Sequence, residues 1–233
     1  MMLRLLLLLA ISLYITSTQA NEAIIDKVYH PYVLSTERKV EWRFVSRESD
    51  NGNILAQRLG YGHSLREDLS LEVYLIGERD SEDNFGIQAY EIESRWVLTE
   101  QGRYWADWGI LVELEKERAE NTWESSIALL FEKEINRTSL TMNLFVGKEW
   151  GDDADEDELQ VSFRMNYRYR LWPEFQPAIE VYTGDEVFGI GPAFTGVYRY
   201  EGKKQLNYDL GFIYDTSGKG QERSLRFSLE WEF

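Results

Sequence analysis

The chain has 233 residues, no cysteine and two histidines, and its 41 acidic and 25 basic residues give a formal net charge of −16. The absence of cysteine excludes intrachain disulfides, zinc–thiolate sites and a lipidated N-terminal cysteine. So acidic a surface does not attract nucleic-acid phosphates, and we expect no nucleic-acid partner and no cofactor. Abundant aromatic residues and only four prolines favour long β-strands over a loop-rich module.

Residues 1–20 are typical of a secretory signal peptide. Arg4 supplies the positive start, Leu5–Leu9 begins the apolar middle, and Thr18–Ala20 offers small residues before a cut at Asn21. The alternative is an uncleaved inner-membrane anchor, for which the apolar run is short. Cleavage would remove one basic residue and no acidic one, which changes the net charge from −16 to −17.

Residues 21–37 show no clean periodicity, and Pro31 fixes an extended local geometry. We expect a periplasmic N-terminal arm, with a periplasmic partner as one candidate for its role. The alternatives are a plug inside a closed sheet, a docking segment and a loosely ordered terminus. His30 stands alone in this stretch, so we expect no metal site there.

From Arg38 onward, apolar and polar residues alternate in segments of about ten residues, which predicts antiparallel β-strands. The clearest segment is 158–171, where Leu159 and Phe163 share one face and Arg164 and Arg168 share the other. If one pair of segments were merged or split, the count of twelve would become ten or fourteen. The predicted strands are 38–48, 54–66, 69–79, 85–98, 106–116, 122–133, 138–149, 158–171, 175–183, 188–200, 205–215 and 223–233.

The last strand, Arg223–Phe233, has strict period-two alternation and ends on an aromatic residue. In this it resembles the closing strand of bacterial outer-membrane β-barrels. The resemblance implies an all-β transmembrane antiparallel barrel over 38–233, located in the bacterial outer membrane and in contact with its lipid and lipopolysaccharide. It also implies that Trp231 and Phe233 are the signal read by the barrel-assembly machinery.

A soluble β-sandwich also alternates, but two features favour the barrel. The apolar face recurs at similar length through nearly every strand, and about ten residues cross a bilayer when the strand is tilted. An open sheet edge is not tolerated in lipid, so the sheet must close. An even number of strands places both chain termini in the periplasm, with the outward links richer in Gly, Asp, Asn and Ser.

If the apolar face contacts lipid, the other face lines the lumen. Acidic residues dominate the fourth to sixth strands, and a basic group lies on the eighth. One hypothesis is a narrow aqueous channel with a transverse field. The alternative is an Arg–Glu network that fills a closed barrel, because twelve strands leave a lumen little wider than its side chains. The predicted lumen-lining residues are Arg43, Glu72, Glu91, Glu93, Arg95, Glu113, Arg164, Arg168, Arg170, Glu180, Arg199, Asp209, Arg226 and Glu230.

Twelve-stranded barrels include an outer-membrane phospholipase and a lipopolysaccharide deacylase, so catalysis must be considered. Nucleophilic catalysis needs a serine within hydrogen-bond reach of a histidine. The phospholipase pattern requires serine two residues after His63, where Leu65 stands, and Ser64 points to the opposite face. We therefore predict no catalytic residues and expect His63 to be a polar residue at the membrane interface.

Two shorter motifs bear on ligand binding. Asp153, Asp155 and Asp157 resemble the start of a calcium loop, but Glu158 and Arg164 stand where the loop needs glycine and glutamate. A solvated loop is favoured over cation bridging to lipopolysaccharide, and no metal site is predicted. The Gly189-Ile-Gly191 stretch fits a bend or a place where another group packs closely.

The sequence thus favours a narrow channel for small ions or polar solutes. One alternative is a closed structural barrel that binds a periplasmic or surface partner. The other is an outer-membrane enzyme that modifies lipid or lipopolysaccharide.

Overall fold

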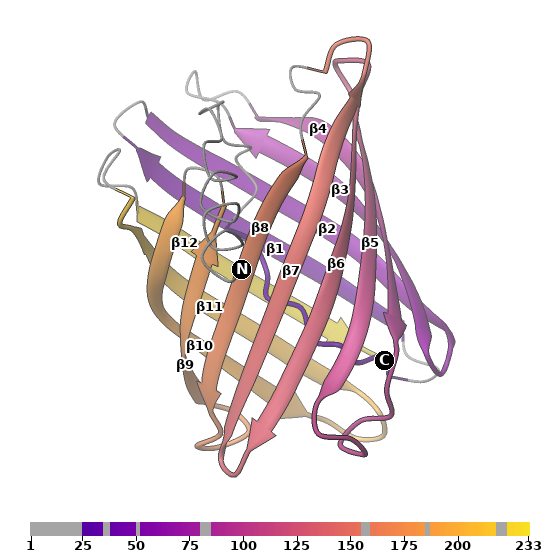
Figure 1. Ribbon diagram of the computed structural model, residues 1–233, viewed down its shortest axis with the longest axis vertical. Helices are drawn as coiled ribbons and strands as arrows, with labels where there is room; N and C mark the ends of the chain where they lie inside the picture. The colour runs from indigo at the N-terminus through magenta and orange to yellow at the C-terminus, as the bar shows by residue number, and fades with distance from the viewer. Residues whose placement is uncertain are drawn as a thin grey trace, which may run out of the picture.

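The computed structural model describes residues 25–34, 38–49, 52–79, 85–154, 159–184, 187–217 and 223–233. Twelve antiparallel strands form a closed barrel in which each strand pairs with its neighbours in the chain and β1 pairs with β12 (Figure 1). The predicted fold class and strand count are therefore confirmed. No helix among the described residues is both long and apolar enough to cross a membrane. The strands are β1 (Arg38–Ser49), β2 (Gly52–Arg66), β3 (Leu69–Arg79), β4 (Phe85–Val97), β5 (Asp107–Glu117), β6 (Thr122–Ile135), β7 (Thr138–Gly151), β8 (Gln160–Tyr169), β9 (Gln176–Thr183), β10 (Phe188–Arg199), β11 (Gln205–Asp215) and β12 (Arg223–Glu232).

The barrel closes through its first and last strands. Val40 lies opposite Trp231 and Phe44 lies opposite Phe227 in an unbroken register. The backbone of Phe233 completes the seam, because its N–H donates to the Arg38 carbonyl at 2.9 Å and its carbonyl accepts from the Arg38 N–H at 3.3 Å. We call this end of the barrel the Phe233 end and the opposite end the far end.

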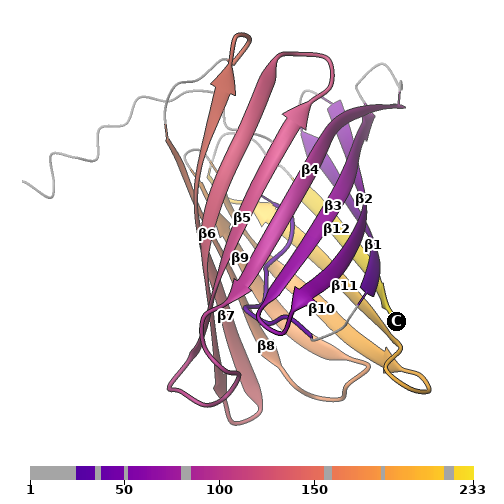
Figure 2. The ribbon, with the colours of Figure 1, turned by 90° about the vertical axis from the view of Figure 1, so that its right-hand side faces the viewer.

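The alternation in the sequence sets which residues face outward. On β1, Val40 and Trp42 are 40% and 38% exposed, whereas Glu41 and Arg43 are 1% and 2% exposed. The same apolar-out pattern appears along β3 and β4, and the strands cross the barrel at a tilt (Figure 2). The outer surface is therefore largely an apolar band, and most charged residues of the strands face the interior.

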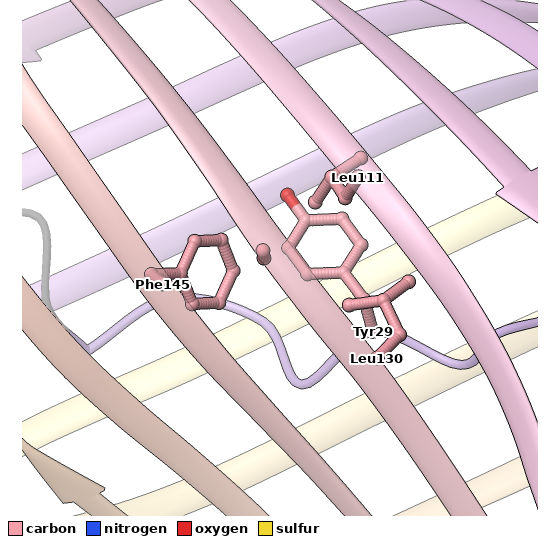
Figure 3. Packing of buried hydrophobic residues seen from close by; sticks show 5 residues of the cluster. Tyr29, Leu111, Leu130 and Phe145 are labelled. Carbon is pink, nitrogen blue, oxygen red and sulfur yellow. The ribbon is translucent and has the colours of Figure 1, made fainter.

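The described part of the arm, residues 25–34, lies inside the barrel, where the trace crosses the lumen behind the strands (Figure 1). Tyr29 is fully buried and packs against Leu111, Leu130 and Phe145 on the inner wall (Figure 3). This differs from the arm outside the barrel that the sequence led us to expect and corresponds to the plug alternative. The reason is that Tyr29 finds both apolar contacts and polar partners in the lumen. The predicted signal peptide, residues 21–24 and residues 35–37 lie outside the described residues.

Ile25 and Val28 anchor the arm at a second apolar cluster, with Tyr182 of β9 and Ile213 of β11. The first cluster belongs to β5, β6 and β7, so the arm bridges opposite parts of the wall. The order of these contacts shows in which direction the arm runs along the barrel. Ile25 lies beside residues near the far end, and the Leu34 carbonyl accepts a hydrogen bond from Ser64, close to the Phe233 end.

Gly191 of β10 confirms the close packing predicted for the Gly189–Gly191 stretch, because a Cβ there would collide with the backbone carbonyl of Phe212. We expect Gly191→Ala to lower the free energy of unfolding by about 1–3 kcal/mol, as overpacking does. Urea unfolding of the barrel in lipid vesicles measures this. Gly86→Ala is the matched control, since a Cβ at Gly86 meets nothing within 4 Å. Equal stability of the two variants would contradict the prediction.

Candidate channel lumen

The centre of the site is built around Tyr29, which is fully buried. Its backbone N–H donates to Asn143 Oδ1 at 2.7 Å, and Asn143 Nδ2 donates to the Tyr29 carbonyl at 2.8 Å. Asn143 thus satisfies the arm backbone as a neighbouring strand would. The Tyr29 hydroxyl donates to Glu93 Oε1 at 2.7 Å and accepts from Arg43 Nη1 at 2.9 Å. Strands on three sides of the lumen therefore hold this one residue.

Charged contacts continue on both sides of Tyr29. Arg43 Nη1 donates to Asp26 Oδ2 at 3.0 Å, and Lys27 Nζ donates to Glu41 Oε1 at 2.7 Å. Burial alone would raise the pKa of Asp26, but Arg43 and the neighbouring arginines outweigh it and hold that pKa well below its usual range. Asp26 is therefore ionised in the folded protein, which keeps its contact with Arg43 a charged one.

Towards the Phe233 end, the remaining arm side chains also find partners on the wall. His30 Nδ1 lies 2.5 Å from Glu132 Oε2, and the Tyr32 hydroxyl donates to Asp107 Oδ2 at 3.0 Å. The Asp26 to Tyr32 stretch is therefore secured mainly by hydrogen bonds and ion pairs. Such contacts can be exchanged for water, unlike those of an apolar core.

The wall itself is braced by buried ion pairs. Arg226 Nε donates to Glu180 Oε2 at 2.7 Å and its Nη2 donates to Asp209 Oδ1 at 2.8 Å. Nearer the Phe233 end, Lys39 Nζ of the neighbouring strand β1 lies 3.0 Å from Glu72 Oε2 and 2.9 Å from Glu230 Oε2. Two of these pairs link strands that are not neighbours, β9 to β12 and β1 to β3, and the other two link adjacent strands.

Two cavities lie along the lumen. The larger, about 330 Å³, opens towards the Phe233 end, and we call it the rim cavity; its lining includes Lys39, Glu72, Arg168 and Glu230. The smaller, about 40 Å³, lies in the far half and is called the acidic cavity. Both are lined by arm residues, the acidic cavity by Asp26 and the rim cavity by residues from Lys27 to Leu34, so the arm takes part in the walls of both. The acidic cavity is lined by Asp26, Arg58, Glu91, Glu113, Glu115, Glu124, Ser126 and Arg164.

Most predicted lumen residues do face the interior. Arg168 is partly buried and lies 3.5 Å from Glu132, Glu113 accepts a hydrogen bond from Ser126, and Arg95 pairs with Glu72 at 3.2 Å. Strand register brings these positions together along the wall. The structure places the following predicted residues on the inner face: Arg43, Glu72, Glu91, Glu93, Arg95, Glu113, Arg164, Arg168, Glu180, Asp209, Arg226 and Glu230.

Arg170 and Arg199 are corrections to the predicted set. Arg170 follows the end of β8 and binds the end of β6 and the turn after it, with Nη1 donating to Glu134 Oε1 at 2.7 Å and Nη2 to the Asn136 carbonyl at 2.6 Å. Arg199 is the last residue of β10 and is exposed at the Phe233 end. Alternation assigns a face only while the strand continues, so both residues belong to the rim and not to the lumen wall.

The set predicted from the sequence omits several buried polar residues of the inner wall. Tyr74 and Tyr182 are inward-facing and buried, and each hydroxyl donates to a wall carboxylate, Glu72 at 2.6 Å and Glu180 at 2.9 Å. Asn143 lies on the inward face of β7. The alternation along each strand places these residues on the inward face. The prediction named only charged residues, however, and so left out neutral polar ones.

No catalytic pair forms at His63. Ser64 points inward, and its hydroxyl donates to the Leu34 carbonyl at 2.6 Å. His63 contributes to the lining of the rim cavity. Among the described residues, no group of three or more His, Asp or Glu side chains is arranged to hold a metal ion.

A closed antiparallel barrel with an apolar outside and a charged inside defines the class of outer-membrane β-barrels. Among solved structures, the chain is similar to an outer-membrane channel from Pseudomonas putida F1, at 13% identity and a TM-score of 0.62 over 92% of this chain and 100% of that one. It is also similar to the KdgM porin in complex with disordered oligogalacturonate, at 10% identity and a TM-score of 0.56 over 84% and 99%. At such identities the similarity shows the fold. No family model and no curated protein matches the sequence.

Proposed function

We propose that the protein is a bacterial outer-membrane channel for small ions or polar solutes, with residues 25–34 as the element that closes it. The observation that carries the proposal is the pair of cavities lined by charged residues, each of which has part of its wall from an arm that hydrogen bonds and ion pairs hold in the lumen. A permanently filled lumen would be expected to be close-packed, with few voids larger than a water molecule. Here movement of one short segment would join the two cavities.

The size of the barrel supports small solutes over large ones. Twelve strands enclose a lumen little wider than its side chains, so even an open path would be narrow. The fold is compatible with this role, since the similar structures described above are named as a porin and a channel. Recognition of Trp231 and Phe233 by the assembly machinery, and contact with lipopolysaccharide, form part of the same proposal.

The test is single-channel recording of the purified protein in a planar bilayer. We expect small or infrequent current steps from the natural protein and larger or more frequent steps from Tyr29→Ala. The variant removes the buried ring and the hydroxyl that bridges Glu93 and Arg43, so it frees space at the centre of the lumen. Circular dichroism of both proteins controls for folding. A folded Tyr29→Ala barrel that carries no current would overturn the proposal.

A second candidate is a closed structural barrel that binds a periplasmic or surface partner. The observation that favours it is the extent of buried ion pairing, with Arg226 and Glu180 both almost fully buried. This candidate predicts no current from either protein. The same recording therefore separates the two functions.

A further inference from the structure

The rim cavity has as many positive as negative side chains in its wall. Four lysine or arginine residues and four aspartate or glutamate residues line it. Lys39 Nζ lies 3.0 Å from Glu72 and 2.9 Å from Glu230, and Asp209 accepts from Arg226 at 2.8 Å. These charges are already paired within the protein, so the cavity offers no excess of either sign to a solute.

This balance disfavours an ion as the occupant of the cavity. An ion that enters loses part of its hydration and finds no uncompensated charge in return, which is a large cost in a partly enclosed site. A solute without net charge avoids that cost. A hydroxyl group is especially suitable, because it can donate to a carboxylate and accept from an ammonium or guanidinium group of the same ion pair.

Neutral polar groups of the wall point to the same kind of solute. Ser70 of β3 is only 7% exposed, and its hydroxyl has no hydrogen-bond partner among the described residues. Asn207 of β11 donates through Nδ2 to Glu230 at 3.1 Å, but its Oδ1 likewise has no partner there. Buried polar groups are normally paired. Both residues line the rim cavity, so a hydroxylated solute inside it would supply a partner that the wall lacks.

The arm gives the cavity a less polar side. Val28, Val33 and Leu34 line it there, together with the rings of His30 and Tyr32. These two rings are parallel to within 4°, with centroids 6.2 Å apart. Carbon-bound hydrogens of a sugar ring pack against such a surface, while polar groups opposite fix its orientation. The volume of about 330 Å³ lies at the lower end of the range for small-molecule pockets.

From these observations we infer that the rim cavity binds a small polyhydroxyl solute without net charge, of the sugar or polyol class. The passage of this solute through the barrel rests on the proposed channel function, to which the inference adds the class of solute. Because the cavity opens towards the Phe233 end, binding can be measured without any current.

The experiment is a titration of the natural protein in lipid nanodiscs, followed by saturation-transfer NMR. The probes are D-glucose, D-glucuronate and D-glucosamine, which share one ring and differ in charge, in a mildly acidic buffer that keeps the amine protonated. We expect glucose to bind at least about tenfold more tightly than either charged sugar, because an uncompensated charge in the cavity is costly. Tighter binding of either charged sugar, or no binding of glucose by the folded protein, would overturn the inference.

Ser70→Ala and Asn207→Ala should each weaken glucose binding by about fivefold, the equivalent of one net hydrogen bond. The matched control is Ser224→Ala, since Ser224 of β12 is 4% exposed and lines neither cavity. It should bind glucose as the natural protein does. Equal binding by the folded Ser70→Ala and Ser224→Ala proteins would place glucose elsewhere and overturn the inference, whereas currents from Tyr29→Ala would still support the channel. Glucose binding with a silent bilayer would overturn the proposed function and leave the binding site in place.

Discussion

Replacing Asn143 with alanine is expected to raise the open probability of the channel by about ten- to a hundredfold. The side chain makes two hydrogen bonds to the backbone of Tyr29, at 2.7 and 2.8 Å, and both are buried. Each such bond is equivalent to about 1 kcal/mol net, and loss of the pair also leaves two buried backbone groups without partners. A difference of 1.4 kcal/mol is a tenfold change in an equilibrium constant. The free-energy difference that favours the closed state over the open state should therefore largely disappear. Single-channel recording measures the change directly.

Thr141→Val is the matched control for this variant. Thr141 lies two residues away on β7, faces inward and is 1% exposed, so it tests burial on the same strand without touching the Tyr29 backbone. We expect its open probability to equal that of the natural protein. If both variants opened to the same extent, general loosening of the barrel would explain the effect, and the arm would not be held by Asn143.

The second large effect concerns stability. Arg226→Met is expected to lower the free energy of unfolding by about 3–5 kcal/mol, because it leaves Glu180 buried without its main counter-ion. Arg226 and Glu180 have side chains only 3% and 0% exposed, and Asp209 loses its partner as well. Urea unfolding of the barrel in lipid vesicles, followed by tryptophan fluorescence, measures the loss.

Two comparisons sharpen this stability prediction. Arg66→Met breaks the exposed pair with Asp68, whose side chains are 62% and 54% exposed, and should change stability by at most about 1 kcal/mol. Adding Glu180→Leu to Arg226→Met removes the unpaired charge and should recover a large part of the loss. If the single Arg226→Met variant were as stable as Arg66→Met, the buried pair would not brace the wall.

Much of the barrel was predictable from the sequence because alternation is a local property. A strand in lipid must be apolar at every second residue, so the pattern gave all twelve strands to within two residues at each end. It also assigned the inward face correctly for Arg43, Glu93 and Arg226. The prediction failed for Arg170 and Arg199, because the strands end there and the alternation no longer fixes a direction.

Residues 25–34 show what local pattern cannot decide. The arm has no periodicity, and its position depends on Asn143, Glu93 and Arg43, which come from strands far apart in the chain. Likewise Glu91, Glu115 and Glu124 are unremarkable alone, and only the register of β4 to β6 places them opposite one another. The sequence by itself determined the strands and their two faces, since these depend on neighbours along the chain. Only the tertiary structure decided how the lumen is closed and where its charges meet, since both depend on contacts between distant strands.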